Sequence, residues 1–168
     1  MGMASALCSK PSHTPDDPSG KPPVLAYPLT AEAFIEALEY ALPDWEVSSE
    51  DSGWFEEGTY ILKDSSKNYV HIYMDVRSLD RVIKSITIFD PICYFIDSTE
   101  FMKDIMPTIN SILDPNSDEE AFRSFYEENC LLATDDQPIP FTGSNFEGKL
   151  SKGASDRPSV TYTFQLDP

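Results

Sequence analysis

The chain has 168 residues, of which 40% are hydrophobic and 12% aromatic, and its formal net charge at pH 7 is −17. This length fits one folded domain with a tail, and the apolar content is sufficient for a hydrophobic core. So negative a chain would be repelled by the phosphates of nucleic acids and anionic membranes, which excludes both as direct partners in our interpretation.

The first 28 residues are predicted to form a disordered tether. The stretch from Lys10 to Pro23 contains five prolines and almost no apolar side chain. Such a segment cannot bury enough surface to offset the entropy lost on ordering. The folded part is therefore expected to comprise residues 29–168 as a single domain.

The domain is expected to open with a helix over Leu29–Pro43. Thr30 is a suitable N-cap, and the proline at the other end prevents the helix from continuing. Apolar side chains recur in this segment at helical spacing, while the glutamates point elsewhere. Two short strands are then predicted, within residues 44–49 and 54–63.

The next two strands are predicted to form the centre of the sheet. In residues 69–76, aliphatic side chains alternate with polar or aromatic ones, so one face of this strand is aliphatic and must be covered. Residues 82–89 are rich in β-branched side chains, which is typical of a central strand. Together with the two strands before them, they predict a four-stranded antiparallel meander.

Two helices and a hairpin are predicted to complete the chain. One helix begins near Thr99 and contains Pro107, where a kink is expected. Another begins at a capping box over residues 117–120. Residues 133–145 are predicted to form a long loop, and residues 146–166 alternate as a C-terminal β-hairpin.

The predicted fold class is therefore α+β. One domain contains a helix, a four-stranded antiparallel meander, two helices and a C-terminal β-hairpin. The helices are expected to cover one face of the sheet. This layout hosts many unrelated functions and by itself assigns none.

The second face of the central strand supplies the candidate binding residues. Its side chains are Tyr69, His71, Tyr73 and Asp75. One interpretation is an aromatic and polar binding surface with the histidine as a titratable group. The other is an ordinary second sheet face, because tyrosine is common on strands for packing reasons alone.

The N-terminal Cys8, followed by a polar tether, resembles the mature end of a bacterial lipoprotein. The resemblance implies that Cys8 is lipidated, that the domain is exported to the cell envelope or outside the cell, and that it meets the membrane only through this anchor. The sequence departs from that pattern at Leu7, where a small residue is expected. The alternative is a cytoplasmic protein with a disordered N-terminus and an incidental thiol.

Two cysteines remain, Cys93 and Cys130, and export would allow a disulfide between them. The alternative is two buried, unpaired thiols. The cysteines lack metal-ligand spacing, and residues 114–125 lack the glycine and glutamate that an EF-hand requires. We therefore expect no metal, no cofactor and no enzymatic activity; a small hydrolase is the least favoured alternative.

The negative charge is concentrated in two tracts. Residues 24–62 contain nine acidic residues and no Lys or Arg, and residues 104–136 contain nine acidic residues and one arginine. Two functions follow as hypotheses. One is an exported, tethered domain that binds a protein or small ligand. The other is a cytoplasmic protein that binds a basic partner, such as an immunity protein, secretion chaperone or nucleic-acid mimic.

Overall fold

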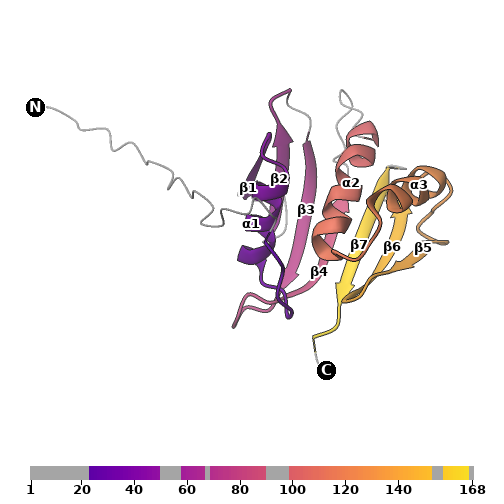
Figure 1. The fold of residues 1–168 in the computed structure, drawn as a ribbon. Helices are drawn as coiled ribbons and strands as arrows, with labels where there is room; N and C mark the ends of the chain where they lie inside the picture. The colour runs from indigo at the N-terminus through magenta and orange to yellow at the C-terminus, as the bar shows by residue number, and fades with distance from the viewer. Residues whose placement is uncertain (1–22, 50–57, 67–68, 90–98, 153–156, 167–168) are drawn as a thin grey trace, which may run out of the picture.

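The computed structural model describes residues 23–49, 58–66, 69–89, 99–152 and 157–166. Within these ranges the chain forms three α-helices and one seven-stranded antiparallel sheet (Figure 1). In chain order the elements are α1 (Ala31–Ala41), β1 (Trp45–Ser49), β2 (Thr59–Asp64), β3 (Tyr69–Val76), β4 (Ile83–Phe89), α2 (Thr99–Leu113), α3 (Glu119–Asn129), β5 (Ile139–Thr142), β6 (Phe146–Lys152) and β7 (Pro158–Phe164).

The sheet joins two parts of the chain that the sequence separates. Its strand order is β1-β2-β3-β4-β7-β6-β5, so β7 pairs with β4. The predicted meander is present, but the C-terminal hairpin continues it instead of standing apart. The α+β prediction is confirmed, and the strand count is seven rather than the predicted four plus two.

The helices lie together on one face of this sheet, as predicted. In Figure 1, α1 lies over the β1–β3 end, α2 over the middle, and α3 over the end formed by β5 and β6. The core lies between the two layers, where the aliphatic sides of the central strands meet the helices. Val70, Ile72 and Met74 of β3 are all at most 2% exposed.

Helix α1 begins as its sequence predicts. The side chain of Thr30 accepts a hydrogen bond from the amide of Ala33, and the helix gives way to Leu42 just before the proline. Phe34 and Leu38 are fully buried, and burying each side chain stabilises the fold by about 1.5–3 kcal/mol. The start of the helix is also fixed to β4, because the amide of Ile83 donates to the carbonyl of Leu29 at 2.8 Å.

Helix α3 begins one residue later than the capping-box prediction. Asp118 is the N-cap, and its carboxylate accepts from the amide of Ala121 at 3.0 Å. Ser117, the predicted cap, instead donates its hydroxyl to the carbonyl of Asp114 at 2.8 Å. The carboxylate of an aspartate caps a helix as well as the hydroxyl of a serine does, so the motif alone did not distinguish the two positions.

Strand β5 was predicted as part of a loop. It runs antiparallel to β6, with Pro140 opposite Lys149. A proline within an apolar run argues against a central strand, but β5 lies at the edge of the sheet, where a missing amide is tolerated. Phe141 fits there because Gly148 leaves room: a Cβ on Gly148 would lie 2.3 Å from the Phe141 ring.

The boundary of the predicted tether also differs in part. Residues 1–22 lie outside the described residues, so the tether itself stays a prediction. Two residues of its last part, 23–28, instead contact the domain. Leu25 and Tyr27 pack against the core, and the Tyr27 hydroxyl donates to the carbonyl of Leu113 at 2.7 Å.

Candidate functional site

The four predicted binding residues share the second face of the sheet, which we define as the face opposite the helices. They lie along β3 at alternate positions. His71 is only 3% exposed, and its ring lies 5.3 Å from that of Phe89 in an edge-to-face contact. Tyr69, Tyr73 and Asp75 are half-buried. The alternation therefore identified the face correctly, but His71 does not present a solvent-facing imidazole.

The middle of this second face is formed by small hydroxyl side chains. Thr87 of β4 and Thr161 of β7 lie opposite each other with their hydroxyls 3.2 Å apart. Ser85 lies opposite Thr163 in the same pair of strands. These residues are 74 or more positions apart, so no local sequence pattern could have brought them together. The resulting surface is uncharged; Thr163 is exposed, and the other three side chains are half-buried.

A buried polar cluster surrounds Asp114, which follows α2. The side chain is 7% exposed. Its carboxylate accepts from the amide of Asn116 at 3.2 Å, and from the amide and hydroxyl of Ser144 at 3.3 and 3.2 Å. Asp114 thus joins the α2–α3 turn to the β5–β6 turn. A carboxylate with these donors is a structural hydrogen-bonding centre.

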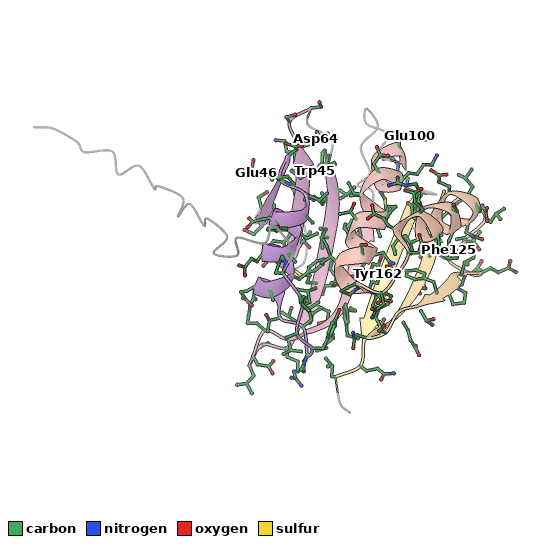
Figure 2. The ribbon with its side chains drawn as sticks, in the orientation of Figure 1. Trp45, Glu46, Asp64, Glu100, Phe125 and Tyr162 are labelled. Atoms are coloured by element: carbon green, nitrogen blue, oxygen red, sulfur yellow. The ribbon has the colours of Figure 1, made fainter. Side chains whose placement is uncertain are left out.

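The same cluster continues into the core. The Asn110 side chain donates to the hydroxyl of Ser117 at 3.2 Å and accepts from the Tyr162 hydroxyl at 3.4 Å. Tyr162 points from β7 towards the helical layer (Figure 2) and is fully buried. The cluster therefore links α2, the turn after it and the sheet. The sequence offered no signal for it beyond individual polar residues.

Burial raises the pKa of two tyrosines in this region. It raises the pKa of Tyr27 to about 12, with a further contribution from the negative charge of Asp114. Burial likewise raises the pKa of Tyr162 well above its usual value. Both hydroxyls are therefore protonated at neutral pH and act as hydrogen-bond donors. This arrangement holds the structure together and does not resemble an acid–base site, which needs a pKa near the working pH.

The cysteines do not form a reactive site among the described residues. Cys130 is buried, and burial raises the pKa of its thiol, which disfavours the reactive thiolate. Cys8 and Cys93 lie outside the described residues, so lipidation and the disulfide stay predictions. Within those described ranges, no group of three or more His, Cys, Asp or Glu residues could hold a metal ion.

Charge separates the two layers of the domain. The three helices contain nine acidic and two basic residues, whereas the seven strands contain four of each. We call α1–α3 together the acidic helical layer. Its two basic residues are already paired: Lys103 with Glu100 at 2.8 Å, and Arg123 with Glu120 at 3.5 Å. All nine carboxylates of this layer are on exposed residues.

Several of these carboxylates form no ion pair among the described residues. The helical acids that form no ion pair there are Glu36, Glu39, Asp104, Glu127 and Glu128. Charges on exposed helix positions contribute little to stability, since even an exposed ion pair contributes at most about 1 kcal/mol. The stability of the fold therefore does not account for this excess of acidic residues. The layer therefore presents an uncompensated negative surface.

An open groove of about 300 Å³ lies between α1 and α2. Ala37 and Ala41 line it on α1, and Thr108 and Ile112 line it on α2. The small alanine side chains leave space where two helices would otherwise interlock. Glu119, the first residue of α3, places a carboxylate at the same groove. We call this the α1–α2 groove.

Comparison with known proteins adds no assignment. No protein-family model matches the chain, and neither a curated protein nor a solved structure matches it. Among the described residues, none of the helices combines the length and the apolar composition needed to cross a bilayer. The function is therefore inferred from the surfaces of the domain.

Proposed function

We propose that this protein is a non-enzymatic binding domain that captures a basic protein through its acidic helical layer. The observation that carries the proposal is the separation of charge: nine acidic against two basic residues in the helices, and four against four in the strands. A surface of one sign attracts a partner of the opposite sign and accelerates its association. The proposal applies equally to an exported and to a cytoplasmic protein.

The non-enzymatic part of the proposal is supported by the surroundings of the reactive side chains. His71 is buried against Phe89, and the thiol of Cys130 is buried with a raised pKa. Asp114 is occupied by donors from two turns. Each of these groups serves packing or hydrogen bonding in the arrangement described above.

The test compares two double variants that remove the same charge from different layers. Glu36→Gln with Glu39→Gln neutralises two helical acids, whereas Glu46→Gln with Glu147→Gln neutralises two acids on strands β1 and β6. The probe is an octa-lysine peptide, whose binding is measured by fluorescence anisotropy at 50 mM and 500 mM salt. We expect the helical variant to weaken binding about tenfold at low salt, and the strand variant to weaken it less than twofold.

Ionic strength provides the second measurement. Salt at 500 mM shortens the screening length to roughly 4 Å, so capture by exposed charges should be largely lost. Binding that ignores salt, or that falls equally in both double variants, would contradict capture by the acidic helical layer. Thermal unfolding of each variant serves as the control for folding.

A further inference from the structure

We infer that the α1–α2 groove is the place where the basic partner docks, and that the occupant is a basic amphipathic helix that inserts an aliphatic side chain. This inference rests on the proposed function, because the charge of the helical layer determines the sign of the partner. The groove adds what charge alone cannot supply, namely an apolar position with a defined shape.

The shape of the groove suits a side chain. Its volume of about 300 Å³ lies at the small end of the range for ligand pockets. The apolar lining comes from Pro23 and Val24 before α1, Ala41 of α1 and Ile112 of α2, together with Ala37, which is itself only 1% exposed. An amphipathic helix commonly binds a protein by placing one or two apolar anchors in such a groove between helices.

The surroundings of the groove determine the charge of the occupant. Glu119 lines the groove itself. Asp104 lies one turn before Thr108 on the same side of α2, so it lies near the groove-lining positions of that helix. Asp104 forms no ion pair among the described residues. Lysine or arginine flanking an apolar anchor would complement them.

The groove also offers polar groups for orientation. Thr108 and Ser111 contribute hydroxyls from α2 to its lining. A helix whose Lys and Arg side chains flank a central Leu would meet hydroxyls near the anchor and carboxylates further out. A neutral or acidic segment would leave those carboxylates without partners. The complementary charge therefore favours a basic helix over a second copy of this acidic chain.

The experiment uses two peptides and the full chain. The first probe is a 14-residue peptide of Leu and Lys with helical periodicity, and the second has the same lysines with Ser in place of Leu. Ala41→Trp fills the groove, and Ala121→Trp places the same side chain on an exposed position of α3 outside the groove lining. Affinities are measured by fluorescence anisotropy at 50 mM and 500 mM salt.

We expect Ala41→Trp to weaken the Leu/Lys peptide at least tenfold, to leave the Lys/Ser peptide within twofold, and Ala121→Trp to change neither. Thr108→Trp blocks the groove from the opposite wall and serves as the second variant if Ala41→Trp melts early. The contrary result is that both peptides bind equally, that neither groove variant changes this binding, and that high salt abolishes it. That result would overturn docking in the groove but would still support capture by the acidic helical layer.

Two other outcomes separate the inference from the proposed function. Leu/Lys binding that both groove variants weaken but that persists at 500 mM salt would support the groove and contradict capture by charge. Self-association of the chain that both groove variants abolish would identify a second copy as the occupant and overturn the basic helix.

Discussion

The acidic helical layer and the second face of the sheet differ in charge and in side-chain type. The helices have an excess of seven acidic residues, whereas the strands are neutral overall. On the second face, acidic residues lie near basic ones at two places: Glu46 lies opposite Lys63, and Asp75 lies 3.4 Å from the amine of Lys84. Threonine and serine fill the middle of this face.

The contrast shows where folding restricts charge and where it does not. Neighbouring strands hold side chains about 5 Å apart, so like charges placed directly opposite each other destabilise the pair. The outer sides of helices face solvent, where charge is screened and costs little. The neutrality of the strands is therefore explained by folding, but the acidity of the helices is not. For this reason the proposed partner-binding surface is the acidic helical layer.

The largest effect is expected where the two layers meet. Ile86→Asp should abolish cooperative unfolding, because it places an unpaired carboxylate at a fully buried position of β4. Thr163→Asp is the matched change on the second face of the neighbouring β7, where the side chain is exposed even though Glu147 lies opposite. It should cost less than about 1 kcal/mol. A normal melting transition for Ile86→Asp would contradict the assignment of the two faces.

A smaller loss of stability is expected when the hydrogen bonds made by Asp114 between the two layers are removed. Asp114→Ala should lower the free energy of unfolding by about 1–3 kcal/mol, because it leaves the amide and hydroxyl of Ser144 without their acceptor. Asp118→Ala removes one exposed N-cap and should cost about 1 kcal/mol. Urea denaturation measures both. An Asp114 variant no less stable than the Asp118 variant would argue against the cluster as a link between layers.

The third prediction concerns alkaline pH. Tyr27 has a pKa of about 12 in the fold against an ordinary value of 10.0. Between these values the unfolded chain loses a proton that the folded chain keeps, so stability falls as pH rises. Tyr27→Phe should lower stability by about 1 kcal/mol at pH 8 and reduce the loss between pH 9 and 11. Thermal melts at several pH values test this, and identical pH profiles would exclude a contribution from Tyr27.

The smallest effect is expected from the charge of the layer itself. Glu127→Gln with Glu128→Gln should raise stability by a few tenths of a kcal/mol, since it reduces repulsion among carboxylates on the helices. Glu46→Gln should change stability in the opposite direction, because Glu46 faces Lys63 across β1 and β2. Both effects should shrink in 500 mM salt. If both variants changed the free energy of unfolding in the same direction, the proposed difference in charge environment between helices and strands would be contradicted.

Local patterns placed most of the elements but not their details. Thr30 caps α1 as predicted, and alternation in β3 assigned every side chain to the correct face. The capping box misplaced the start of α3 by one residue, because Ser117 and Asp118 are both good caps. Pro140 concealed β5, because a proline is acceptable only at a sheet edge and the sequence does not show where the edge lies.

The candidate sites were less accessible from sequence. Alternation grouped Tyr69, His71, Tyr73 and Asp75 on one face but could not show that His71 is 3% exposed. Exposure depends on what the neighbouring strands contribute, here Phe89 of β4. The acidic tracts were visible in the sequence. Those of their acids that lie on α1–α3 come together on one layer only because the three helices lie on the same side of the sheet (Figure 1).

The sequence by itself determined the helices, most of the strands, the α+β class and the amount of negative charge, because periodicity, caps and composition act over a few neighbouring residues. Only the tertiary structure decided that β7 pairs with β4, that Asp114 meets Ser144, and that α1 and α2 leave a groove between them. Those features join residues that are distant along the chain. Their formation depends on how whole faces pack together, which no local pattern encodes.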